Sequence, residues 1–147
     1  MLHVGFTGTR RGMTTRQELA FQRVLGGLGA VTAFHHGDCI GADYQAHEIA
    51  AMLDIPIVIH PPIDGSRRAF CATSTDLASW CVAEIRKPLP YLERNRAIVD
   101  ASSVLIAVPY EARGSVPRSG TWSTVRYAVK RGVTVIVIRP DGTVEEA

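Results

Sequence analysis

Cysteine, aromatic residues and excess charge are all scarce in this 147-residue sequence, and each scarcity removes a class of protein. The three cysteines, Cys39, Cys71 and Cys81, are odd in number and form no Cys-x-x-Cys pair, which argues against a disulfide framework and a four-ligand zinc site. Sixteen basic and 14 acidic side chains leave a formal net charge of +2, so the chain lacks the basic field that drives non-specific DNA binding. The unpaired cysteines indicate a reducing compartment.

Long apolar segments are also missing. From Met1 the chain runs straight into a strand-like stretch, without the basic and apolar regions of a signal peptide. No segment approaches membrane-spanning length. We therefore expect a cytoplasmic protein with no membrane partner.

Short apolar runs alternate with segments of helical period along most of the chain. Five runs indicate buried strands, at residues 2–6, 31–34, 55–59, 104–108 and 133–138. Segments of helical period separate them, at residues 21–28, 42–53, 92–101 and 122–130. The alternation predicts one α/β domain over residues 1–147, with a Rossmann-like, doubly wound, mainly parallel sheet of five or slightly more strands and helices on both faces.

Residues 60–90 interrupt this alternation. They are rich in proline and turn residues and contain a single helical hint, at residues 77–85. A connection this long inside a domain is usually functional or mobile, so we expect a flap or partner surface, with a plain surface insertion as the alternative. Residues 139–147 are expected to form a tail or a short edge strand.

Two turns combine glycine with hydroxyl groups where a strand and a helix meet. Residues 8–10 (Gly-Thr-Arg) follow the first strand, and residues 117–121 (Pro-Arg-Ser-Gly-Thr) open the last helix. Glycine lets backbone N–H groups approach an anion closely, and a helix N-terminus presents free N–H groups to one. Each turn taken alone also fits an ordinary connection or a helix cap.

A third turn carries carboxylates. Gly37, Asp38 and Asp43 follow the second strand and open the next helix. Either carboxylate could accept hydrogen bonds from a ribose or a base, and the alternative is that it caps the helix and complements its dipole. The adjacent His35 and His36 point to opposite faces of a strand, so we expect no metal site and no cofactor.

A fourth group lies on the helix before the fourth strand. The phrase Glu93-Arg94-Asn95-Arg96 places two guanidinium groups and an amide within three positions. Such residues suit a phosphate site, because arginine recognises phosphate bidentately. The alternative is a solvated helix face with an Arg–Glu pair.

The order of strands and helices favours a shared pocket. The turns at residues 8–10, 36–43 and 117–121 each follow a strand and precede a helix, so in a parallel sheet they converge on one edge, where ligands bind. The ligand-binding residues that we expect there are Gly8, Thr9, Arg10, Gly37, Asp38, Asp43, Arg94, Asn95, Arg96, Ser119, Gly120 and Thr121.

In order and spacing, these motifs resemble the SLOG superfamily, which includes the DNA-processing protein DprA, the LOG-type nucleoside-monophosphate phosphoribohydrolases and small stand-alone sensors. The resemblance covers nearly the whole chain apart from residues 60–90 and the tail. It implies a Rossmann-like fold and a pocket for a nucleotide or nucleotide derivative, which the protein would bind as a sensor, sponge or carrier. Members are often dimers, so a homodimer is expected.

Two more specific functions follow from the resemblance. LOG-type enzymes cleave an N-glycosidic bond, and Arg94 matches their catalytic arginine, but Thr124 stands where their second motif has a glutamate. A hydroxyl cannot stabilise the cationic transition state as a carboxylate does, so Asp38, Asp43 or Glu93 would have to act instead. DprA-like binding of single-stranded DNA is the least favoured function, because such binding uses basic surfaces with stacking aromatics, and only 7% of these residues are aromatic.

Overall fold

Seven strands form one sheet in the computed structural model, which describes residues 1–73, 80–110 and 119–147. They are β1 (Leu2–Gly8), β2 (Val31–His36), β3 (Ile57–Ile59), β4 (Val82–Ile85), β5 (Val104–Val108), β6 (Thr134–Ile138) and β7 (Val144–Glu146). Their order is β4-β3-β2-β1-β5-β6-β7, and every neighbouring pair is parallel except β6 and β7. The predicted Rossmann-like, mainly parallel α/β fold is confirmed, with two strands more than the five apolar runs.

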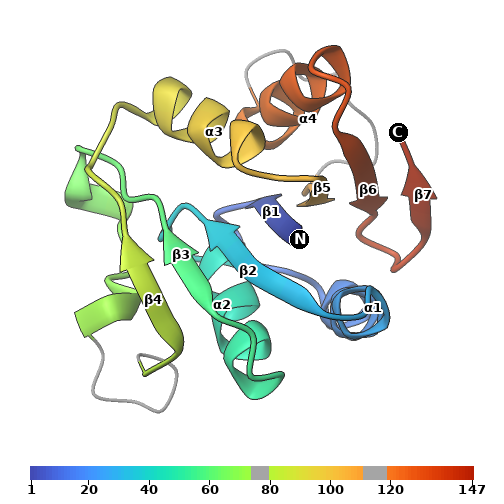
Figure 1. Ribbon diagram of the computed structural model, residues 1–147. Coiled ribbons are helices and arrows are strands. Elements are labelled where there is room, and N and C mark those ends of the chain that lie inside the picture. Colours follow the sequence, from blue (N-terminus) through green and yellow to red (C-terminus); the bar gives the residue numbers. More distant parts are fainter. Residues whose placement is uncertain (74–79, 111–118) are drawn as a thin grey trace.

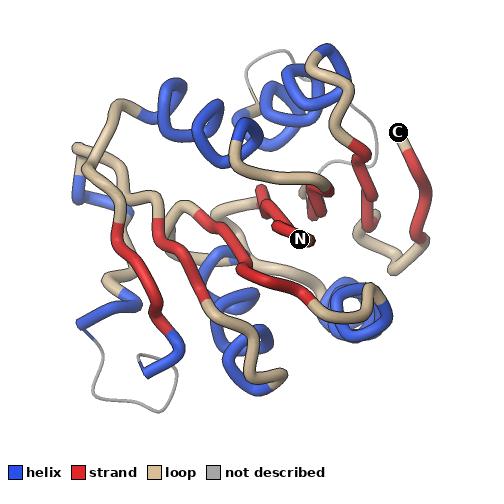
Figure 2. The backbone as a smooth tube through the Cα atoms, viewed as in Figure 1, coloured by secondary structure: helices blue, strands red, loops and turns tan. Residues whose placement is uncertain are grey.

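Four α-helices cover the two faces of the sheet (Figure 1). The helices α1 (Thr15–Gly27) and α2 (Ala42–Met52) pack on one face, and α3 (Tyr91–Asp100) and α4 (Gly120–Lys130) pack on the other. Figure 2 shows the strands between these two helix layers. The chain changes its direction of travel across the sheet between the neighbouring strands β1 and β5, which makes the crevice at their carboxyl ends the expected ligand site.

Each face has its own apolar core. On the α1/α2 face, the rings of Phe6, Phe21 and Phe34 lie with centroids 5.2 to 5.8 Å apart. On the α3/α4 face, β5 and β6 contribute Leu105 and Val135 to a second cluster. The strands alternate between the two, as a period of two requires. Among the described residues, no helix has the length and apolar character that spanning a bilayer requires.

Residues 60–90 differ from the sequence expectation. The helical hint at residues 77–85 is wrong for Val82–Ile85, which forms strand β4, and residues 77–79 lie outside the described residues. Pairing with β3 gives hydrogen-bond partners to an otherwise open sheet edge, with Ile57 opposite Val82. The described part of this segment also contains the short 3₁₀ helices η1 (Gly65–Arg67) and η2 (Cys71–Thr73). At the other edge of the sheet, the tail forms strand β7, antiparallel to β6.

Candidate functional site

A pocket of about 370 Å³ lies at the carboxyl ends of β1, β2 and β5, a volume typical of small-molecule sites. Segments far apart in the sequence line it: residues 6–11, Gly37, Cys39, Asp43, Arg67, Tyr91, Arg94, Asn95, Ile98, Tyr110 and residues 119–121. Of the twelve ligand-binding residues expected from the sequence, all but Asp38 and Arg96 lie in this lining. The structure therefore brings the three strand-to-helix turns and α3 to one crevice.

The turns that follow β1 and β2 are in direct contact. The backbone N–H of Ala42 donates to the carbonyl oxygen of Thr9 at 3.0 Å. Gly41 has a φ of 86°, and a Cβ there would lie 2.3 Å from the carbonyl oxygen of Arg10. Glycine is thus required at position 41 both for its positive φ and for the close approach of the turns after β1 and β2. The two turns together make one side of the pocket.

The amino end of α4 makes another side. Ser119 caps this helix, because its Oγ accepts the backbone N–H of Trp122 at 3.4 Å. Gly120 and Thr121 follow in the lining with the free N–H groups of the first helical turn, where the helix dipole favours an anion. Pro117 and Arg118, which belong to the same predicted turn, lie outside the described residues.

Arg94 is almost fully buried, at 5% exposure, and holds the pocket wall together. Its Nη1 donates to the carbonyl oxygens of Gly37 and His60, the residues that follow β2 and β3. Its Nε donates to Asn95 Oδ1 at 2.8 Å, and its Nη2 lies 3.6 Å from Cys39 Sγ. A Cβ at position 37 would lie 2.4 Å from the guanidinium, so Gly37 makes room for it. Four of the five N–H groups are therefore committed to the protein, which leaves one for a ligand.

Asp43 is the carboxylate of the lining. It is buried, and its Oδ2 accepts the backbone N–H of Cys39 at 3.1 Å. Burial raises its pKa from 3.8 to about 6, against the opposing effects of the Arg94 charge and the Cys39 hydrogen bond. A carboxyl group with such a pKa exchanges a proton close to neutral pH, which suits an acid–base role.

Asp38, Glu93 and Arg96 do not reach the pocket. Asp38 is fully buried and pairs with Arg68, with 2.7 Å between Oδ2 and Nε. Glu93 is exposed, and Arg96 lies over the ring of Tyr127 in a separate groove of about 250 Å³ between α3 and α4. Two positions along a helix correspond to a rotation of about 200°, so Arg96 cannot share the face of Arg94.

Several lining residues were not anticipated from the sequence. Arg11 lies with its Cζ 4.3 Å from the ring centroid of Tyr110, and both residues closely follow the strands β1 and β5. Their position at a carboxyl strand end is a signal that could have identified them. Tyr91 opens α3, and Arg67 comes from the irregular segment after β3. Arg67 has no local signal, because a tertiary contact brings it to the site.

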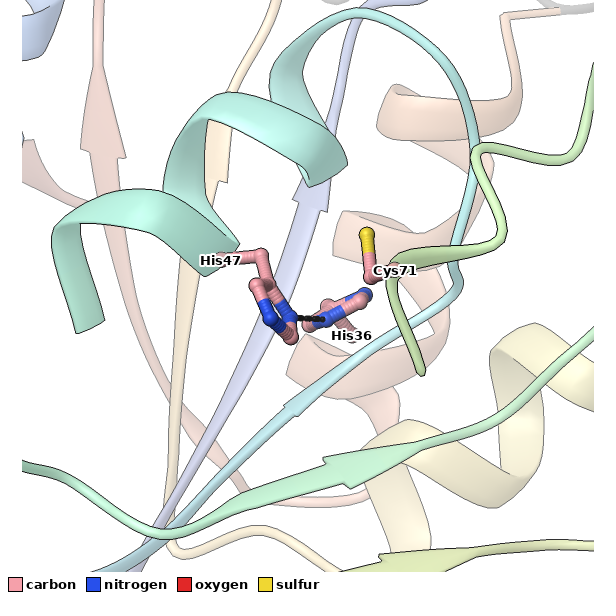
Figure 3. A group of neighbouring side chains, drawn as sticks. All are labelled: His36, His47 and Cys71. Carbon is pink, nitrogen blue, oxygen red and sulfur yellow. Dashed lines mark hydrogen bonds between the residues drawn. The ribbon is translucent and has the colours of Figure 1, made fainter. Parts of the chain in front are cut away.

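His36, His47 and Cys71 form a buried group beside the β2 turn, with candidate metal-ligand atoms within 4.8 Å of one another (Figure 3). His36 Nδ1 accepts the backbone N–H of Asp38 at 2.9 Å, so its Nε2 must carry the ring proton. That proton is shared with His47 Nδ1 at 2.8 Å. His36 thus has no free lone pair for an ion while the Asp38 contact holds, and we assign the group to a buried hydrogen-bond network rather than to a metal.

Comparisons with known proteins identify solved structures with a similar fold, but no relative by sequence. No family model and no curated protein matches the chain. Among solved structures, the DprA of Streptococcus pneumoniae is similar with a TM-score of 0.69 and 20% identity, over 93% of this chain and 50% of that one. The DprA of Helicobacter pylori, whose structure describes a mode of single-stranded DNA binding, has a TM-score of 0.60 and 23% identity, over 92% and 64%.

A third structure, the structural-genomics target TM1055, has a TM-score of 0.63 and 15% identity, over 97% of this chain and 76% of that one. The chain thus spans half to two thirds of the two DprA chains and three quarters of TM1055. At these identities the likeness concerns the fold. The Rossmann-like fold that the SLOG resemblance implies is confirmed.

Proposed function

We propose that the protein binds a nucleotide or nucleotide-derived phosphate ligand in the pocket at the β1/β5 switch point, as a sensor, sponge or carrier. The observation that carries this proposal is the charge of the lining. Among the described lining residues, four arginines, Arg10, Arg11, Arg67 and Arg94, accompany one carboxylate, and the positive end of α4 joins them. Such a surface favours an anion of more than one charge.

The uncharged part of the lining suits the rest of a nucleotide. Tyr91 and Tyr110 offer aromatic faces on which a base can stack, and Tyr110 is half exposed. Asp43 is positioned to accept hydrogen bonds from sugar hydroxyls. The pocket therefore combines the three chemistries that a nucleotide presents, which a simple phosphate site would not need.

Calorimetric titration with mononucleotides tests the proposal, after native mass spectrometry of freshly purified protein has revealed any retained ligand. We expect Arg10→Ala to weaken nucleotide binding about tenfold, because it removes a charge-assisted hydrogen bond. Arg23→Ala is the matched control, since Arg23 is exposed on α1 and outside the lining. If neither inorganic phosphate nor any of the mononucleotides binds, the proposal is overturned.

Asp43 supports a second candidate, LOG-type hydrolysis of a nucleoside monophosphate. Thr124 cannot replace the missing glutamate, since its Oγ1 donates to the Gly120 carbonyl oxygen at 2.8 Å and it lines the other groove. With Asp38 and Glu93 outside the pocket, Asp43 is the carboxylate that the described part of the lining offers to the transition state. We expect Asp43→Asn to abolish release of free base while nucleotide binding persists, and wild-type release to fall as the pH drops below about 6. Absence of base release at high protein concentration would exclude this candidate.

Two partner predictions also remain. We propose a homodimer, which light scattering on the purified chain would test. DNA binding by the DprA of Helicobacter pylori is a property of that protein, and the net charge of +2 here does not favour it. Single-strand binding that weakened steeply with salt would reverse this preference.

A further inference from the structure

A clasp built on Asp38 fastens residues 67–71 to the β2 turn. The Asp38 carboxylate pairs with Arg68 through Oδ2 at 2.7 Å and accepts the backbone N–H of Cys71 through Oδ1 at 2.9 Å. Its carbonyl oxygen accepts the backbone N–H of Ala69 at 2.7 Å. One fully buried residue thus contacts three residues, Arg68, Ala69 and Cys71, of the segment after β3. We call Asp38, Arg68 and these contacts the Asp38 clasp.

Two of the three non-glycine residues with a positive φ in the described part of the chain lie at or beside the clasp, and the third is Asp54. Asp38 has a φ of 58° and Phe70 a φ of 56°, the left-handed region that residues with a side chain rarely adopt. The Arg68 guanidinium lies between them, with its Cζ 4.7 Å from the Phe70 ring centroid. Strained conformations persist where surrounding contacts over-determine them, and they cluster at functional sites.

The clasp fixes the main chain of Arg67. The Arg67 carbonyl oxygen accepts the backbone N–H of Ile40 at 2.9 Å, and Arg68 forms an antiparallel bridge with Cys39. The Arg67 side chain remains exposed, and it lines the pocket. Arg67 is therefore anchored to the turn after β2, although it follows β3 in the sequence.

Arg67 and the α4 N-terminus lie on opposite sides of the turn after β1. The main chain of Arg67 is bonded to the turn after β2, α4 follows β5, and β2 and β5 flank β1 in the sheet. Arg67 and residues 119–121 nevertheless line the same pocket. The positive groups of the lining thus come to it from both sides of β1.

We propose that the Asp38 clasp positions Arg67 to bind a second anionic group, so that the site takes a nucleotide with two or more phosphates in preference to one with a single phosphate. This rests on the proposed phosphate-binding function. Arg67 contacts the ligand, and Asp38 acts through Arg67 as a positioning residue. The preference is a ratio of affinities, which a merely structural role for Arg67 would not alter.

Calorimetry with orthophosphate, pyrophosphate, AMP and ADP tests the preference. We expect wild-type protein to bind pyrophosphate at least tenfold more tightly than orthophosphate, and ADP more tightly than AMP. Arg67→Ala lowers pyrophosphate affinity about tenfold and orthophosphate affinity by much less, Arg67→Lys restores part of the loss, and Arg23→Ala changes neither. Equal affinities for the two inorganic anions, or a ratio unaffected by Arg67→Ala, would overturn the inference and leave the proposed function standing. Absence of binding by all four probes would overturn both.

A double-mutant cycle tests the role of the clasp. Asp38→Asn keeps a residue that tolerates a positive φ but removes the charge, and Arg68→Ala removes the partner, which is 20% exposed and so less liable to prevent folding. Thermal unfolding verifies that each variant is folded. Each substitution alone should lower the ratio of pyrophosphate affinity to orthophosphate affinity, and the same substitution should not change that ratio further in a protein that already carries Arg67→Ala. Equal losses with and without Arg67 would show that the clasp does not act through it.

Discussion

The two halves of the sheet are stabilised by different interactions. Around β5, β6 and α4, which we call the apolar half, the buried side chains are mostly aliphatic, such as Leu105 and Val137. Around β2, β3 and α2, the polar half, lie most of the buried polar and charged side chains: His35, His36, Asp38, Asp43, His47, His60 and Arg94. Apolar burial is indifferent to pH, whereas a buried hydrogen-bond network requires particular protonation states. The pocket lies where these halves meet.

Histidines cross the polar half in a continuous row. His3 Nδ1 lies 3.0 Å from His35 Nε2, and His35 Nδ1 lies 2.9 Å from His60 Nε2. Burial, reinforced by neighbouring positive groups, lowers the pKa of His35 to about 4 and that of His60 to about 3. Burial likewise holds the pKa of His36 well below its ordinary value. The native polar half therefore contains neutral imidazoles.

Acid should produce the largest effect, and only through the polar half. Below pH 6.5 the unfolded chain protonates histidines that the folded chain keeps neutral, so stability falls by about 1.4 kcal/mol per pH unit for each, between pH 6.5 and the folded pKa. Asp43 partly offsets this, because its raised pKa lets the folded state bind a proton below about pH 6. Urea midpoints at pH 7, 6 and 5 measure the slope, and His35→Gln should reduce it. Constant stability from pH 7 to 5 would contradict the comparison.

Replacing Arg94 by alanine should cost about 3 kcal/mol or more. The change leaves the buried carbonyl oxygens of Gly37 and His60 without their donor and opens a void between β2, β3 and α3. Arg96→Ala is the matched control on the same helix, and it should cost less than about 0.5 kcal/mol because that side chain is exposed. Urea unfolding measures the free energy of unfolding of the two variants. Similar decreases for Arg94→Ala and Arg96→Ala would mean that the Arg94 contacts contribute little to stability.

Glycines of the two halves should respond differently to a methyl group. Gly41→Ala is expected to cost about 1–3 kcal/mol, because φ is positive and the new Cβ would meet Arg10 backbone. Gly120→Ala should change stability by less than about 0.5 kcal/mol, since no described residue lies within 4 Å of a Cβ there. Thermal and urea unfolding measure both. A destabilised Gly120→Ala with an unaffected Gly41→Ala would reverse the argument.

The apolar half could be predicted more completely than the polar half. Continuous aliphatic runs indicated β5 and β6, and helical spacing indicated α4, as it also indicated α2 in the polar half, because burial imposes a visible period on the sequence. The same logic correctly set His35 and His36 on opposite faces, since one bonds to His60 and the other to His47. Strand β4 was not predicted from the sequence, because most of its residues are exposed and it is specified by pairing with β3 and not by burial.

At the site, sequence order identified the turns but not the roles of their side chains. Convergence of strand ends follows from topology, so Gly8, Asp43 and Ser119 were brought together as expected. The burial of Asp38 under Arg68 could not be inferred, because its partner lies 30 positions away in a segment without periodicity. The buried position of Arg94 could not be inferred either. Its partners are the backbone carbonyl oxygens of Gly37 and His60, and a backbone carbonyl leaves no signal in the sequence because every residue has one.

The smallest loss that we expect from removing a contact belongs to the apolar half. Ser119→Ala removes the side-chain cap of α4 and should cost about 1 kcal/mol, because the Trp122 N–H loses its acceptor. The cap involves no titrating group, so the loss should be the same at pH 7 and pH 5, unlike the effects in the polar half. Urea unfolding at the two pH values measures this difference. A loss that grew in acid would mean that the histidine network extends across β1 to α4, and that the two halves of the sheet are coupled rather than independent.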